Sequence, residues 1–215
     1  MRHIRNFKLL IAAFAIAGST QAWAADFGGD QAPPAAAPKS VTDTISFDAT
    51  PEWSAATGAY ADTVLKLGWS HVLGQGWSWG ASVSQQFRVS GINNTSVETT
   101  LGYGNIKLSD AVSLPVSAGI GYVWDGQAGP PSTLAWAYYL VSLGLNVKFD
   151  SHWTWNVVQG RYRNAFQGGW ETPKVQTGVT YSFDSRTAIY GNVGYSWKNG
   201  VADKVSTTVG ARFGF

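Results

Sequence analysis

The chain has 215 residues and no cysteine, and charged residues make up only 13% of it, against roughly 25% in ordinary soluble domains. The absence of cysteine excludes a disulfide framework, thiol catalysis and thiolate metal sites. Three of the 15 basic residues precede residue 25. The remainder is therefore close to neutral and has no basic stripe with which to bind nucleic acid.

Residues 1–24 predict a secretory signal peptide. Three basic residues precede an uncharged stretch (residues 9–17), and Ala22, Trp23 and Ala24 form a small-x-small cleavage site. The apolar stretch is too short to span a bilayer. We therefore expect export, with cleavage near Ala24 and Ala25, followed by a Pro/Ala-rich periplasmic lead-in over residues 25–40.

Beyond residue 40, apolar and polar side chains alternate with a period of two, which is typical of β-strands with one apolar face. In residues 77–89, for example, Trp79, Val83 and Phe87 alternate with small polar residues. A soluble β-sandwich also alternates, but these stretches are longer than its usual strands and suit a tilted membrane crossing. The ten predicted strands are residues 42–50, 62–72, 77–89, 95–107, 112–125, 134–149, 153–163, 173–183, 187–198 and 204–215.

An internal repeat indicates the number of strands. Residues 144–152 align without a gap on residues 178–186, and the chain ends on a third Gly and Phe five residues apart, Gly210 and Phe215. With two looser copies upstream, the repeat gives five descending strands and hence ten in all. The predicted fold class is all-β, a closed antiparallel up-and-down transmembrane barrel over residues 41–215, with eight strands as the alternative. Pairing of the first strand with the last removes both sheet edges.

Aromatic side chains gather beside the predicted turns and loops. Between them the same strand faces carry mainly Leu, Val, Ile and Ala, as a lipid-facing band between two polar interfaces requires. The predicted aromatic girdle residues are Trp69, Trp77, Trp79, Trp124, Trp153, Trp155, Phe183, Trp197 and Phe213.

The leader ending in Ala24, the single meander and the last strand ending in Phe215 resemble small proteobacterial outer-membrane β-barrels of the porin-family or OmpA-like type. The resemblance covers everything after residue 40 and implies the outer membrane of a Gram-negative bacterium. It also implies that Phe215 is the signal read by the barrel-assembly machinery, that periplasmic chaperones escort the chain, and that outer-membrane lipids and lipopolysaccharide surround it. It does not imply one activity, because the class includes pores, adhesins, structural barrels and enzymes.

Candidate catalytic groups are scarce. Enzymes of the resembling class use His together with Asp, Glu or Ser at the outer rim, whereas His71 and His152 both fall at predicted periplasmic turns. The sequence contains no nucleophile elbow, phosphate loop or metal-spaced cluster. We therefore expect no catalytic residues, no metal and no other cofactor, and an outer-membrane protease or lipid hydrolase is the disfavoured interpretation.

The inward face carries more basic than acidic side chains. Such charges must be paired or reached by water. A narrow passive pore with a mild anion preference is therefore the predicted function, with a sealed structural or anchoring barrel and a loop-mediated adhesin as alternatives. The predicted lumen-lining charges are Lys66, Arg88, Glu98, Asp125, Lys148, Arg161, Arg163, Lys198 and Arg212, and the same parity also points Lys174, Asp48 and Glu171 inward.

The hairpin around Asn93 predicts one specific contact. Arg88 and Glu98 lie five residues on either side of Asn93, on the polar parity of their strands. Side chains directly opposite on neighbouring strands are close enough to form an ion pair. We therefore expect Arg88 and Glu98 to pair inside the lumen.

Overall fold

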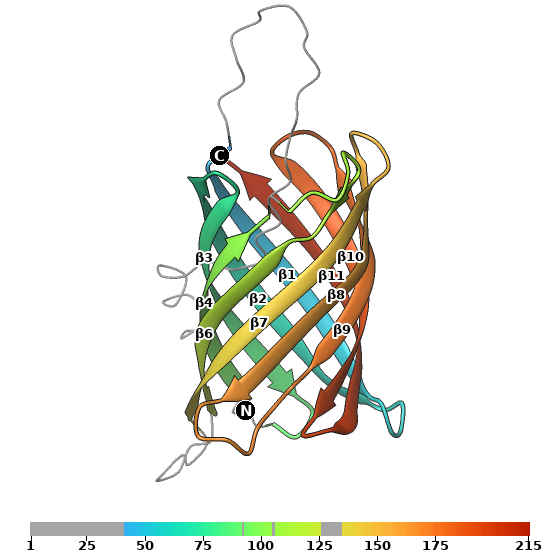
Figure 1. Cartoon of the computed structure of the whole chain (residues 1–215). Coiled ribbons are helices and arrows are strands. Elements are labelled where there is room, and N and C mark those ends of the chain that lie inside the picture. Colours follow the sequence, from blue (N-terminus) through green and yellow to red (C-terminus); the bar gives the residue numbers. More distant parts are fainter. Residues whose placement is uncertain (1–40, 92, 105, 126–134) are drawn as a thin grey trace, which may run out of the picture.

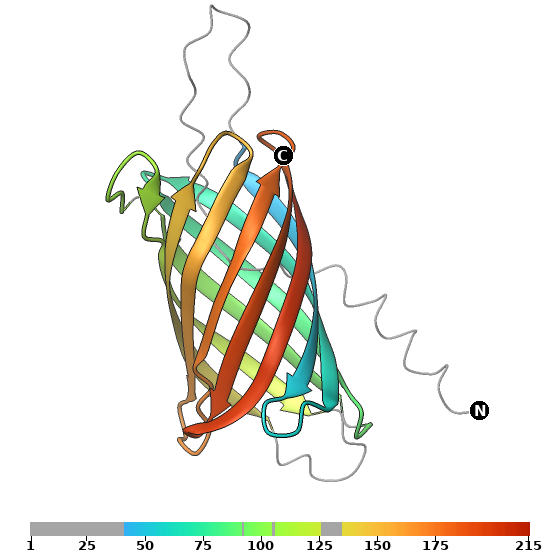
Figure 2. The same cartoon turned by 90° about the vertical axis from the view of Figure 1, so that its right-hand side faces the viewer.

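The computed structural model describes residues 41–91, 93–104, 106–125 and 135–215, so the predicted signal peptide and lead-in lie outside the described residues. These residues form a closed antiparallel β-barrel with tilted strands (Figure 1 and Figure 2). Within them no helix is long and apolar enough to cross a membrane. The strands are β1 (Asp43–Ser54), β2 (Tyr60–Gly74), β3 (Trp77–Arg88), β4 (Asn94–Tyr103), β5 (Val112–Ser113), β6 (Val116–Asp125), β7 (Trp136–Lys148), β8 (Trp153–Ala165), β9 (Lys174–Ser182), β10 (Thr187–Lys198) and β11 (Val201–Gly214).

Ten long strands follow one another around the barrel, and β1 pairs with β11 to close it. This pairing runs from Thr44 opposite Gly214 to Ser54 opposite Lys204. The prediction of a closed ten-strand all-β barrel is therefore confirmed. Strand β1 continues four residues past the predicted end at residue 50, so Pro51 lies in the barrel wall and not in a loop.

The barrel has two rims, which we call upper and lower from their places in Figure 1. The first residues of β1 and the last residues of β11 lie at the upper rim, next to the C-terminus (Figure 1). The described residues of the connections at the upper rim are 75–76, 104, 106–111, 149–152 and 183–186, and those at the lower rim include 55–59, 89–91, 93, 166–173 and 199–200.

The single strand predicted over residues 112–125 is divided into β5 and β6. Pro115 lies between them and has no N–H with which to continue the ladder. The register against β7 is unchanged across the break, because Val112 pairs with Val147 and Val116 with Leu143. The prediction is thus wrong about continuity but places both pieces on the correct neighbour.

A β-bulge in β8 reverses its two faces. Asn156 lies opposite Asn146 on β7, whereas the next partner of β7, Leu145, lies opposite Val158, so residue 157 is the extra one. An extra residue shifts the side-chain alternation by one position. As a result Trp155, 40% exposed on the outer face, and Arg161, which lines the lumen, face opposite ways although both have odd numbers.

The outer face is apolar along the length of the barrel. Large side chains such as Leu143 (56% exposed), Val193 (54%) and Val209 (63%) point outward without cover. Of the predicted girdle residues, Trp77, Trp79, Trp153, Trp155, Phe183 and Phe213 are exposed, while Trp69, Trp124 and Trp197 are half-buried against neighbouring aromatic rings.

Candidate functional site in the barrel lumen

The lower half of the lumen encloses a cavity of about 500 Å³. A second cavity of about 60 Å³ adjoins it, and the two share Lys66, Arg161, Lys174 and Gln176. Seven basic side chains line the larger cavity, against four acidic ones. The basic ones are Lys66, Arg88, Arg161, Arg163, Lys174, Lys198 and Lys204, and the acidic ones are Asp48, Glu52, Asp62 and Asp203.

Most of the predicted lumen charges lie on these cavities, including Glu98 on the smaller one. Arg212 lies in the upper half of the barrel, where it interacts electrostatically with Tyr190. Lys148 is exposed at the upper end of β7. Glu171 accepts a hydrogen bond from Tyr162 near the lower rim (2.9 Å). The side chain of Asp125 lies outside the described part of the chain.

The predicted ion pair between Arg88 and Glu98 is wrong. Glu98 lies opposite Ser82 on β3, because the hairpin pairs Gln86 with Asn94 and so centres on residue 90. Arg88 lies opposite Asp62 on β2 instead.

Glu98 forms its ion pair with Arg163, which reaches it from β8. The Tyr138 hydroxyl donates to the same carboxylate oxygen at 2.8 Å, and the Arg163 guanidinium lies 5.4 Å from the centre of the Tyr138 ring. The ring of Tyr138 packs over Gly121, where a Cβ atom would collide with it. Three strands therefore hold this buried pair across the lumen.

A second ion cluster joins β11, β1 and β2 near the lower rim. Lys204 Nζ lies 2.7 Å from Glu52 and 2.6 Å from Asp62. The sequence prediction omitted all three residues. Lys204 has the same parity as Ser206 and Thr208, so the alternation in β11 could have identified it, whereas Glu52 was assigned to a loop.

The upper half of the lumen is filled by buried neutral side chains, which we call the upper polar cluster. The amide of Asn156 lies 3.3 Å from the Thr180 hydroxyl and 3.4 Å from the Asn192 carbonyl oxygen. No formal charge occurs in the cluster. Its members are Ser78, Ser82, Thr100, Asn146, Asn156, Thr180, Ser182 and Asn192.

Between the two halves, Tyr190 donates a hydrogen bond to Asp48 across β11. The Tyr190 ring occupies the space above Gly210, where a Cβ atom would collide with the ring and the carboxylate. The predicted inward orientation of this repeat glycine is confirmed.

His71 and His152 both lie near the upper rim and have partners. His71 Nδ1 is 3.0 Å from Asp43, and His152 Nδ1 is 2.8 Å from the Ser182 carbonyl oxygen. In the described residues no group of three His, Asp or Glu side chains is placed to hold a metal ion.

No family model matches the chain, and no curated protein matches it. Among solved structures it is similar to an outer-membrane channel from Pseudomonas putida F1, with 9% identity over 87% of this chain and 100% of that chain and a TM-score of 0.50. The fold is that of an outer-membrane barrel. The NanC porin (11% identity, 78% of this chain and 98% of that one, TM-score 0.46) and the KdgM porin (12%, 79% and 99%, 0.43) are further matches. At such identities the likeness concerns the fold alone.

Proposed function

We propose that this chain is an integral protein of the bacterial outer membrane and acts as a narrow passive pore with a mild anion preference. The observation that carries the proposal is the 500 Å³ lumen cavity with seven basic and four acidic side chains on its wall. Adding Glu98 from the smaller cavity still leaves an excess of positive charge.

The outer face supports the location. Continuous apolar surface of this extent marks a membrane or partner interface, and aromatic side chains flank it toward both rims, as in transmembrane barrels. Cleavage near Ala24, recognition of Phe215 by assembly machinery and contact with lipopolysaccharide belong to the same proposal.

The lumen charge supports the anion preference. Fixed positive charge in a confined aqueous space raises the local concentration of anions and lowers that of cations. Small anions would therefore carry more of the current than small cations do.

Planar-bilayer recordings under a salt gradient test this proposal. We expect small conductance steps and a reversal potential of the sign that anion preference gives. Arg161→Gln/Lys174→Gln should lower the anion-to-cation permeability ratio, and Lys174→Gln alone should lower it less. Arg186→Gln, which like Lys174→Gln removes one charge but at an exposed turn, should leave it unchanged. A cation-preferring wild type would contradict the charge argument.

A sealed structural barrel is the second candidate. The upper polar cluster favours it, because its eight members are buried and Asn156 bonds to both Thr180 and Asn192. Among the described residues, Ser78, Thr100 and Asn146 each keep one buried polar atom without a partner. Silence over many confirmed insertions would select this alternative over the pore.

A further inference from the structure

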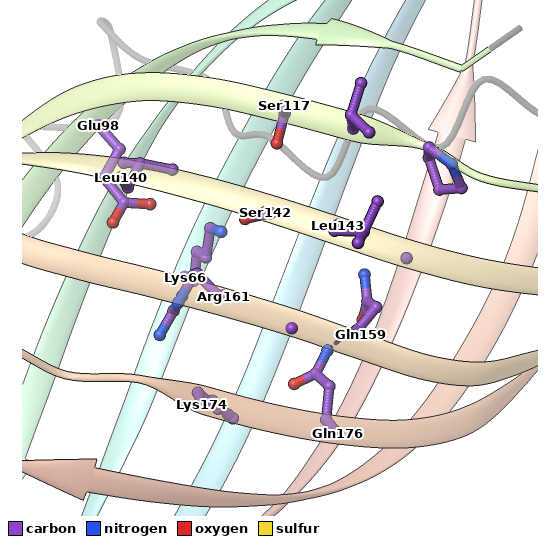
Figure 3. A pocket seen from close by; sticks show the side chains of 14 residues that line it. Lys66, Glu98, Ser117, Leu140, Ser142, Leu143, Gln159, Arg161, Lys174 and Gln176 are labelled. Carbon is purple, nitrogen blue, oxygen red and sulfur yellow. Dashed lines mark hydrogen bonds between the residues drawn. The ribbon is translucent and has the colours of Figure 1, made fainter. Parts of the chain in front are cut away.

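Three cations meet across the middle of the lumen without a direct partner. Lys66 projects from β2, and Arg161 and Lys174 project from β8 and β9 on the opposite wall (Figure 3). Each of the three interacts repulsively with the other two. Among the described residues, none of them forms an ion pair or a hydrogen bond to an acidic side chain.

The carboxylates that face this cluster are already engaged. Each has a closer partner than the three cations, which these carboxylates attract through space without a direct contact. Glu98 binds Arg163 and Tyr138, Glu52 binds Lys204, and Asp48 accepts from Tyr190.

The cluster also holds an unused donor. The Nε–H of Arg161 is buried and has no acceptor among the described residues. A buried cation that lacks both a counter-charge and an acceptor is costly. Arg161 lacks that acceptor, and it lies beside two further cations that repel it, so a negative ion at this place would be stabilised.

Neutral donors complete the site. Besides the three cations, the polar lining of the smaller cavity consists of Ser117, Ser142, Gln159 and Gln176, together with Glu98, whose carboxylate is paired with Arg163. Gln176 donates its amide to the carbonyl oxygen of Gln159, which leaves the Gln159 amide nitrogen as a further donor. The volume of about 60 Å³ is well above the roughly 10–15 Å³ that a cavity needs to admit one water, so the site has room for a small solute.

We propose that Lys66, Arg161 and Lys174 form a binding site for one phosphate-sized oxyanion at the floor of the larger cavity. A guanidinium offers a planar pair of donors that matches two oxygens of such an anion, and the two ammonium groups supply further charge from other directions. A dianion balances three cations better than chloride does. The site adds a ligand to the proposed function. It rests on that function, because solutes must enter the lumen from the lower rim to reach it.

Equilibrium binding to the detergent-folded full chain tests the site directly. Inorganic phosphate is titrated by calorimetry at constant ionic strength and pH, with chloride as the background salt. We expect saturable binding of one phosphate per chain. Sulfate should compete, and a sugar phosphate distinguishes the two sources: binding it as well means that the site accepts the group on a larger solute, whereas refusing it means that the site takes the free ion.

The variant Arg161→Gln/Lys174→Gln should bind phosphate at least about tenfold more weakly, because it removes two charge-assisted contacts. Arg186→Gln removes one charge at an exposed turn, which makes it the matched control for Lys174→Gln, and it should bind as the wild type does. Heat-modifiable gel mobility verifies that each variant is folded. If the double variant fails to fold, Lys174→Gln is tested alone and should bind phosphate more weakly than the wild type. Lys174→Arg, which keeps the positive charge, should retain binding.

Non-saturable binding, or equal affinity in the wild type and the double variant, overturns the site. The proposed pore is tested by conductance, independently of phosphate binding. A chain that binds phosphate stoichiometrically but never conducts retains the site and loses the pore. A chain that conducts anions but shows no saturable phosphate binding retains the pore and loses the site.

Discussion

The two halves of the lumen accommodate polar side chains inside the barrel in different ways. The upper half is packed mainly with neutral hydroxyl and amide side chains, with Arg212 as a charged exception, whereas the lower half holds many charged side chains around open space. A neutral polar group can be buried dry once it has one or two hydrogen bonds. A charge needs a close counter-charge or water. The charge distribution along the strands therefore decides where this barrel is filled and where it stays hollow.

The largest expected effect follows removal of the partner of Glu98. The Glu98 side chain is 5% exposed, and Arg163→Gln would leave its buried charge without its ion-pair partner, with the Tyr138 hydrogen bond and the attraction of Lys66 and Arg161 remaining. We expect a loss of about 3 to 5 kcal/mol in the free energy of unfolding, measured by urea titration of the protein folded in lipid vesicles. The double variant Glu98→Gln/Arg163→Gln removes both charges and should recover most of the loss. An equally unstable double variant would show that the stranded carboxylate is not the cause.

Single cysteines compare the two halves directly, since the chain has none of its own. Ser84 lines the larger cavity, and Ser78 lies on the same strand in the upper polar cluster, 4% exposed. A water-soluble methanethiosulfonate reagent should modify Ser84→Cys readily. It should modify Ser78→Cys roughly 100-fold more slowly, because reaction there requires a local opening of about 2.7 kcal/mol. Equal rates would mean that water fills the upper half as well.

A methyl group at the boundary between the halves should be tolerated poorly. In Gly210→Ala the new Cβ collides with the Tyr190 ring and Asp48, and we expect a destabilisation of about 1 to 3 kcal/mol from overpacking. Gly191→Ala on the neighbouring strand is the control, because its Cβ would lie 3.9 Å from the nearest atom, the Thr208 carbonyl oxygen. Both are measured by the temperature at which gel mobility changes. Similar shifts in the two variants would place Tyr190 elsewhere.

The smallest expected effect lies outside both halves, in the two repeated upper turns. The Asp150 carboxylate accepts from the N–H groups of Trp153 and His152, and Asp184 accepts from those of Arg186 and Thr187. These bonds lower the pKa of both carboxyls below the ordinary 3.8. Their contribution to stability is therefore present above about pH 4 and is lost as the pH falls through the lowered pKa.

Asp150→Asn/Asp184→Asn should reduce this acid-dependent loss of stability. The measurement is the difference in urea midpoint between pH 6 and pH 3, compared with wild type. Asp110→Asn, a like change at the same rim, is the control. An unaltered pH dependence in the double variant would contradict the role of the two turns.

The strand number could be predicted from the sequence because each hairpin repeats a local pattern. Inward glycines and outward aromatics, such as Gly210 and Phe215, recur at fixed spacing, and alternation within a strand needs no knowledge of its neighbours. The orientation of Arg161 depends on more than alternation. Only the bulge at residue 157 allows Trp155 to face lipid while Arg161 faces the lumen, and neither Val157 nor Val158 marks it in the sequence.

The contacts across the lumen could not be predicted from strand patterns. Glu98 and Arg163 lie three strands apart, and their relative height depends on the tilt and shear of the closed barrel. The register of the hairpin between β3 and β4 had a local signal that the prediction did not use. Gly91 has a φ of 82°, the left-handed conformation that marks a turn glycine, and centring the turn near it gives the observed pairs.

Because β1 pairs with β11, the order of the strands along the chain can be changed while their order around the barrel is kept. Phe215 donates its N–H to the Asp43 carbonyl oxygen at 2.9 Å, so a short peptide could join the two ends. Opening the chain in the two-residue turn at Asn199 and Gly200 would then give a circular permutant in which all the strand pairings could form as before. In that permutant β11 would precede β1 along the chain, although it would keep both of its neighbours. Comparing the membrane insertion of the permutant with that of the parent would distinguish the contribution of β11 to the barrel wall from the contribution of its position in the chain order.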